Sequence, residues 1–246
     1  MAPHAWHIDT AIHYNTAFKY MESPSVTPVL MSLIERSAAP LNVVEYQFAV
    51  DATGFAFCRF DRWYEEKYGA IKSKKQWLKA HLACGTMTNI VTAAKVTESN
   101  RNDGPELPGL VQRTADNFVL EEVSADKGYA GVFNHNAIED LGAKSYIMFK
   151  AGATGAVGGA YGKMFHYFSL NKEEFLRHYH RRSNVESTVM MIKTKFGDSV
   201  RSKSKEAATN EILCKILAHN ICCLISAMFE LELTIDLGKR EWARTA

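Results

Sequence analysis

The sequence predicts an α/β protein built on a mixed five-stranded sheet flanked by helices, and two observations support this prediction. Large apolar side chains occupy every second position from Val44 to Val50, which is the period of a β-strand. Residues 118–149 carry a strand pattern, a helix pattern and a second strand pattern in succession. Such a unit forms a parallel pair with a right-handed crossover, so the sheet should combine parallel and antiparallel neighbours.

The remaining elements follow in chain order. Thr27 and Pro28 are expected to begin a helix, with Thr27 as its N-cap, and Pro40 to close it. Asp51 comes directly after the first expected strand, and Asp126 directly after a later one. Beyond the first strand, we expect strands at residues 77–84, 90–96, 118–125 and 146–149, and helices at 107–117, 133–141, 172–195 and 205–233.

Composition indicates a globular protein with a sizeable core, because 47% of the 246 residues are hydrophobic and 23% are charged. The N-terminus has no basic start followed by an apolar run, and the apolar stretch at 216–229 is short for a membrane span. We therefore expect a cytoplasmic protein with a core helix there. Five cysteines without a C-x-x-C pair argue against a disulfide framework and a zinc site, and favour reduced, buried thiols.

The net charge of +2 hides an uneven distribution of charge along the chain. Residues 172–205 contain nine Lys and Arg against four Asp and Glu, a local charge of +5, and residues 51–80 contain seven against four, a local charge of +3. The rest of the chain must therefore sum to −6. This pattern suits a protein with one anion-binding face. For either segment alone, ordinary solvated surface charge is an equally good explanation.

Four polar side chains should share one face of the expected helix at 172–195. Tyr179, Arg182, Glu186 and Lys193 stand at offsets of 0, 3, 7 and 14, which places them within about a 60° sector of the helix. An i, i+4 ion pair on a solvated helix would by itself account for Arg182 and Glu186. Lys193 is too far from Glu186 for a simple ion pair, so ion pairing does not explain why all four side chains share one face.

The pattern Y-x₂-R-x₃-E-x₆-K resembles the motif of one group of bacterial insertion-sequence DDE transposases. Asp51, in V-D-A-T-G-F, and Asp126, in A-D-K-G-Y, resemble the first two catalytic aspartates of that family, and Glu186 resembles its third carboxylate. The order and the spacings of 75 and 60 residues agree with the family. The segments at 59–69 and 219–225 also look like it, so the resemblance covers about residues 14–233.

The resemblance implies a ribonuclease-H-like fold and a metal-dependent reaction on DNA. Asp51, Asp126 and Glu186 would be the catalytic residues and the ligands of two Mg²⁺ ions, with Mn²⁺ as a possible substitute, in an enzyme that cleaves DNA strands and transfers them. Tyr179 and Lys193 would hold DNA phosphates. Arg182 would either do the same or orient Glu186, and both roles are compatible. The implied partners are the transposon ends and target DNA, with a homodimer forming on the DNA.

The resemblance also suggests a domain division and leaves two other functions open. Residues 1–40 are expected to be a helical connecting segment left from a missing N-terminal region, residues 41–233 the catalytic domain, and residues 234–246 a tail. A catalytically silent remnant that still binds DNA is one alternative. A ribonuclease-H-like nuclease that cleaves without rejoining is the other, although the Tyr-Arg-Glu-Lys helix favours the transposase.

Three weaker patterns complete the sequence. The glycine-rich segment at 152–162 lacks a P-loop ending and is expected to be a flexible loop. Aromatic and basic residues mix at 59–68, where they could stack on an unpaired DNA end, although a core-facing aromatic stripe is the somewhat better explanation. His178 and His180 alternate on the expected helix and so point apart, which argues against a metal site.

Overall fold

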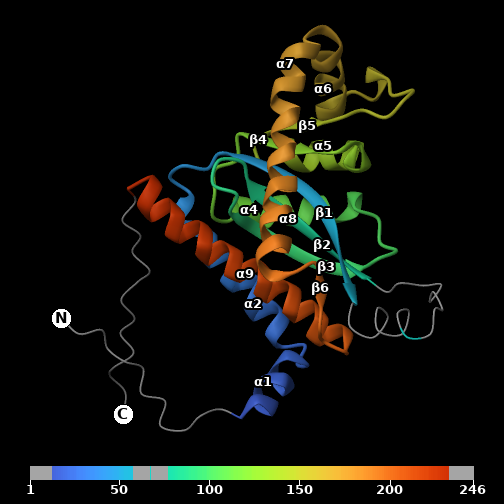
Figure 1. The fold of residues 1–246 in the computed structure, drawn as a ribbon. Coiled ribbons are helices and arrows are strands. Elements are labelled where there is room, and N and C mark those ends of the chain that lie inside the picture. The colour runs from blue at the N-terminus through green and yellow to red at the C-terminus, as the bar shows by residue number, and fades with distance from the viewer. Residues whose placement is uncertain (1–12, 58–66, 68–76, 233–246) are drawn as a thin grey trace.

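A computed structural model describes residues 13–57, 67 and 77–232 and shows a mixed sheet between two layers of helices (Figure 1). The sheet order is β3-β2-β1-β4-β5. β1 is antiparallel to β2, and β2 to β3, whereas β1, β4 and β5 are parallel. The strands are β1 (Gln47–Phe57), β2 (Trp77–Gly85), β3 (Val91–Glu98), β4 (Glu122–Ala125) and β5 (Lys144–Ile147). The predicted five-stranded mixed sheet is confirmed, and a sixth strand of two residues, β6 (Ser199–Val200), runs parallel to the end of β1.

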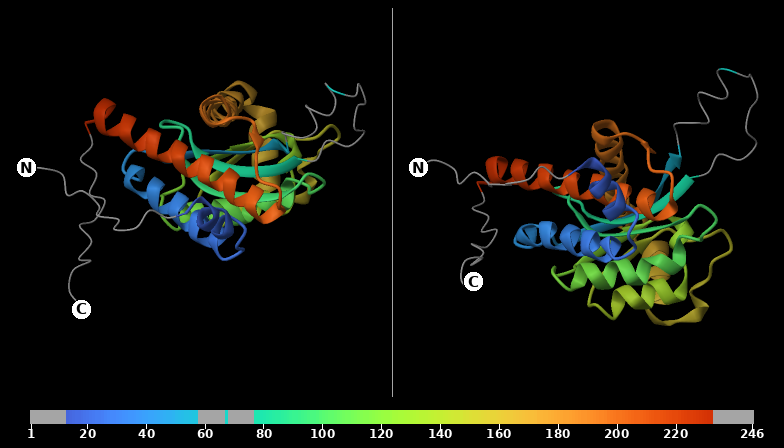
Figure 2. Two further views of the ribbon diagram at one scale, coloured as in Figure 1. Left: turned by 60° about the horizontal axis from the view of Figure 1, so that its bottom comes forward. Right: turned by 90° about the horizontal axis from the view of Figure 1, so that it is seen from below.

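The helices pack on both faces of this sheet, as the views in Figure 2 show. One hydrophobic core lies between the sheet and α4 and α5, and it takes Phe48 and Val50 from β1. The second lies between the sheet and α2, α8 and α9, and it takes Ala49 and Phe55 from the same strand. The described helices are α1 (Tyr14–Met21), α2 (Val26–Ala38), α4 (Leu107–Ala115), α5 (Val132–Glu139), α6 (Gly159–Leu170), α7 (Lys172–Tyr179), α8 (Ser183–Phe196) and α9 (Lys205–Glu230).

Helix α9 is long and apolar enough to cross a membrane by length and composition alone. Its contacts are those of a core helix. Ile212 and Ile216 are buried in the second core, and the fully buried Asn220 bonds to β3, accepting from Val91 N at 2.9 Å and donating to Val91 O at 2.8 Å. An amide that completes the bonding of a strand residue fixes the helix against the sheet. The packing therefore agrees with the core helix expected at 216–229.

The segment before residue 40 is continuous with the body of the protein. Leu30 and Ile34 of α2 lie in the second core. Thr27 is not the N-cap that the sequence indicated, because α2 begins at Val26 and the Thr27 hydroxyl donates to Asn210 Oδ1 on α9 at 2.7 Å. The proposed domain boundaries at 40 and 233 remain predictions.

Three further expectations need correction. The helix expected at 172–195 is divided into α7 and α8 by a 3₁₀ turn, His180–Arg182. The glycine-rich segment is not all loop, because α6 begins at Gly159 and runs through Gly162, where a Cβ would lie only 3.0 Å from the carbonyl oxygen of Gly155. The strand expected at 118–125 is reduced to β4, because residues 118–121 do not pair as a strand before the parallel ladder with β1 begins at Glu122.

Candidate active site

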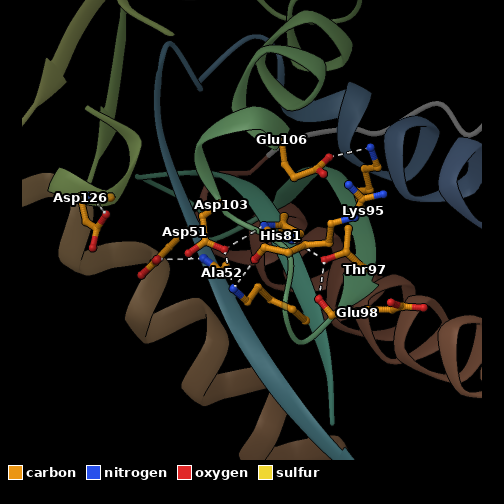
Figure 3. Close-up of polar contacts among 12 residues, drawn as sticks. Asp51, Ala52, His81, Lys95, Thr97, Glu98, Asp103, Glu106 and Asp126 are labelled. Carbon is orange, nitrogen blue, oxygen red and sulfur yellow. Dashed lines mark hydrogen bonds and ion pairs between the residues drawn. The ribbon is translucent and has the colours of Figure 1, made fainter. Parts of the chain in front are cut away.

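The first two carboxylates lie at the same edge of the parallel half of the sheet. Val50 of β1 pairs with Ala125 of β4. Asp51 directly follows Val50 in the sequence, and Asp126 directly follows Ala125. Asp51 is not at the end of its strand, as the sequence suggested, because β1 continues to Phe57 along its antiparallel partner β2. It stands instead where the parallel ladder ends, so the expected proximity of the two aspartates is preserved (Figure 3).

The turn after β4 orients Asp126. The residue caps a 3₁₀ turn, Lys127–Tyr129, and its Oδ1 accepts a hydrogen bond from Gly128 N. A larger residue here would displace the carboxylate, because a Cβ at position 128 would lie 2.8 Å from that oxygen. Tyr129 is buried below the turn and anchors it in the core. The A-D-K-G-Y sequence thus forms a tight, anchored turn that presents one carboxylate.

The third carboxylate approaches the same edge from α8. Glu186 lies in the first turn of this helix, where the backbone N–H groups favour a negative charge. Arg182, just before α8, bridges two of the carboxylates. Its Nη2 lies 2.7 Å from Glu186 Oε1, and its Nη1 lies 3.3 Å from Asp51 Oδ2. Tyr179 is close by, with its ring centroid 5.9 Å from the Arg182 guanidinium carbon.

The charges of the other two carboxylates act on Asp51. Burial raises the pKa of Asp51 above its usual value, and the negative charges of Asp126 and Glu186 raise it further. The backbone N–H of Ala52, 2.8 Å from Asp51 Oδ1, and the Arg182 guanidinium act in the opposite direction. A partly desolvated group of negative charges of this kind favours a bound cation.

The chemistry of the three carboxylates suits a hard divalent ion, but their present distances from one another do not. Carboxylate oxygens are the ligands that Mg²⁺ prefers. Within residues 13–57, 67 and 77–232, however, no three acidic, histidine or cysteine side chains are close enough together to ligate one ion. The Arg182 guanidinium bonds to both Asp51 and Glu186. The three carboxylates lie near one edge of the sheet. For one metal site to include all three, they would have to move closer together and the Arg182 side chain would have to move away.

Lys193 lies apart from the other residues of its motif. Its Nζ is 5.4 Å from the ring centroid of Phe55, four residues beyond Asp51 along β1. Burial lowers the pKa of this lysine, and Asp198 opposes the shift. Helix α8 packs over the face of β1 that carries Ala49 and Phe55. Arg182 and Glu186 lie near one end of α8, beside Asp51, and Lys193 lies near the other end, beside Phe55. The four side chains are therefore spread along β1 and do not form one cluster.

Several residues around the site were not singled out by sequence reasoning. On the opposite face of the sheet, the buried His81 bonds through Nε2 to Thr97 Oγ1 at 2.8 Å (Figure 3). Lys79 Nζ lies 2.8 Å from Asp103 Oδ1. Asn184 and Thr188, on either side of Glu186, bond to the turn between β2 and β3. Their partners are distant in sequence, so only the spacing of two residues around Glu186 could have drawn attention to them.

The weaker candidates have structural roles or lie outside the described residues. His178 stacks on Tyr146, with ring centroids 4.5 Å apart, and its Nδ1 lies 2.8 Å from Glu122 Oε2. These contacts fix α7 against β4 and β5. The mixed aromatic and basic segment at 59–68 lies outside the described residues except for Lys67.

The architecture and the site define a class of protein. A mixed sheet in the order 3-2-1-4-5, with two aspartates where its parallel ladder ends and a glutamate on a helix above, is a ribonuclease-H-like α/β fold. The family model described as "Transposase DDE domain" matches residues 44–221. The chain belongs to this family. The matched stretch contains all three carboxylates together with Tyr179, Arg182 and Lys193, and family membership makes DNA the implied partner.

Proposed function

We propose that the chain is the catalytic part of an insertion-sequence DDE transposase, which cleaves DNA strands and transfers them with Asp51, Asp126 and Glu186 as metal ligands. The observation that supports this proposal is that three carboxylates, far apart in the sequence, lie near one edge of the sheet, where the charges of Asp126 and Glu186 both raise the pKa of the half-buried Asp51. Placing like charges near a half-buried carboxylate costs stability, which favours a functional explanation for the group.

The chain would contribute mainly positioning to this reaction. Two divalent ions bound to the carboxylates would activate the attacking oxygen and stabilise the leaving oxygen. The backbone N–H groups of Ala52 and Gly128 orient the two aspartate carboxylates. Glu186 would then have to move towards them, and Arg182 away, for all three to bind metal. Phosphoryl transfer requires little more of a protein than alignment and compensation of charge.

The basic and aromatic residues beside the carboxylates would hold the DNA. Arg182 and Tyr179 lie next to Asp51 and Glu186, where they can contact the phosphate at the reacting bond. Lys193 lies further along β1, so it would contact the backbone at a separate point. Binding through such contacts is salt-dependent and nearly independent of sequence. We further propose that the protein acts as a homodimer on paired DNA ends in the cytoplasm.

Two measurements on the purified chain test this function. With Mg²⁺ or Mn²⁺ and DNA carrying the element's terminal repeats, we expect nicked products and joined products on sequencing gels. Asp51→Asn, Asp126→Asn and Glu186→Gln should each lower cleavage at least about 100-fold with little change in thermal stability, because each removes one anionic ligand at constant volume. Cleavage without joined products would identify a nuclease, and DNA binding without cleavage would identify a silent remnant. Retention of most of the metal-dependent activity in one variant would remove that residue from the site.

A further inference from the structure

Helix α8 is attached to the sheet through the turn between β2 and β3, residues 86–89, which we call the β2–β3 turn. Asn184 Nδ2 donates to Thr86 O at 2.7 Å. The single hydroxyl proton of Thr188 is shared between Asn89 Oδ1, 3.1 Å from Oγ1, and the Asn184 carbonyl oxygen, 3.0 Å away. Asn184 and Thr188 stand two positions before and two positions after Glu186. Because residues two apart on a helix point in nearly opposite directions, both hold the face of α8 that lies away from the carboxylate.

The β2–β3 turn is itself fixed by buried groups. Glu45 is 1% exposed, and its carboxylate accepts from Met87 N at 3.1 Å and from Thr88 Oγ1 at 2.7 Å. His219 Nε2 donates to Asn89 O at 2.9 Å from the other side. At Gly85 a Cβ would clash with the Glu45 carboxylate, so glycine is needed to admit it. Met87, Thr88 and Asn89 of the turn are thus each bonded to a group outside it.

We propose that Asn184 and Thr188 are positioning residues, which set where Glu186 stands relative to Asp51 and Asp126 by holding α8 to the β2–β3 turn. The turn is a direct extension of β2, whose Leu82 pairs with Asp51. A continuous path therefore joins two of the carboxylates, from Asp51 through β2 and its turn to the two side chains that flank Glu186. The inference rests on the proposed function, because the position of Glu186 affects activity only if Glu186 is a metal ligand.

A matched pair of variants at one position separates positioning from general stability. Thr188 is fully buried. Thr188→Val keeps its shape and loses the hydroxyl, whereas Thr188→Ser keeps the hydroxyl and loses a methyl group. Both changes should lower the melting temperature modestly and to a similar extent. Thr188→Val should raise the half-saturating Mn²⁺ concentration at least about tenfold, whereas Thr188→Ser should leave it nearly unchanged.

Mn²⁺ binding is measured by electron paramagnetic resonance, and cleavage rates should follow the same order. Asn184→Ala is expected to act like Thr188→Val, and Ser187→Ala, an exposed change on the same helix, serves as the control. If Mn²⁺ affinity and cleavage fall together with melting temperature in both Thr188 variants, the residues are only structural and the inference is overturned while the function stands. If the Asp51→Asn variant binds Mn²⁺ as tightly as the wild type does, the proposed function fails and the inference fails with it.

Discussion

The two aspartates and the glutamate of this site are held in different ways. Asp51 and Asp126 follow paired residues of adjacent parallel strands, so the backbone ladder of the sheet determines their separation. Glu186 stands on a helix that meets the sheet through side chains, and its own side chain is 57% exposed. One half of the site is therefore built into the sheet, whereas the other half depends on how a separate element is attached.

The largest effect should come from changing the length of each carboxylate side chain. Asp51→Glu moves a carboxylate that a strand holds in place, and misplacement by about 1 Å can cost on the order of 100-fold in rate. Glu186→Asp should cost only about tenfold, because the Glu186 side chain is more exposed than that of Asp51 and has more freedom to reorient. Single-turnover cleavage rates measure both effects, with unfolding temperatures as the control. Equal losses would show that α8 is as rigid as the sheet.

Arg182 links the two halves, and its removal should have an intermediate effect. The guanidinium bonds to Asp51 and Glu186, so it would compete with a metal for both carboxylates. Arg182→Gln should tighten Mn²⁺ binding in the absence of DNA by up to about tenfold, roughly 1.4 kcal/mol, while it slows cleavage. Arg181→Gln is the matched control, because Arg181 bonds to Glu122 instead. Weaker Mn²⁺ binding in Arg182→Gln would mean that the arginine orients Glu186 and does not compete with the ion.

The smallest effect should be a pH dependence confined to the helix side. Burial lowers the pKa of His219, whose Nε2 supports the β2–β3 turn. In a state in which α8 is detached from the β2–β3 turn, we expect His219 to take up a proton near its ordinary pKa of about 6.5. Attachment of α8 should thus be constant above that pH and weaken as the pH falls below it, until the lowered pKa is passed.

Hydrogen exchange of α8 amides, corrected for intrinsic rates, measures this effect. Between pH 7.5 and 5.5 protection should fall by up to about tenfold in α8, while β1 and β4 remain protected. His219→Gln, which retains a donor but does not titrate, should abolish the difference. Parallel loss of protection in α8 and β1 would show that the whole domain opens at once.

The sheet half of the site was predictable from the sequence, and the helix half only in part. Apolar alternation placed β1, and turn residues after β4 placed Asp126, because these signals are local. The 3₁₀ turn at His180–Arg182 and the position of Lys193 over Phe55 depend on packing against the sheet, which helical periodicity does not contain. The bonds of Asn184 and Thr188 to the β2–β3 turn join segments about a hundred residues apart, with no local pattern to mark them.

The short length of β4 leaves one edge of β1 without a parallel partner at Asp51. β4 stops opposite Val50, and β6 does not begin to pair with β1 until Ala56. Between these points one edge of β1 has no neighbouring strand among the described residues. The main-chain groups of β1 beside Asp51 are therefore not paired to a strand on that edge. A β4 longer by one pair of residues would place a strand beside Asp51, and the cap that Asp126 and Gly128 form ends β4 just before that point.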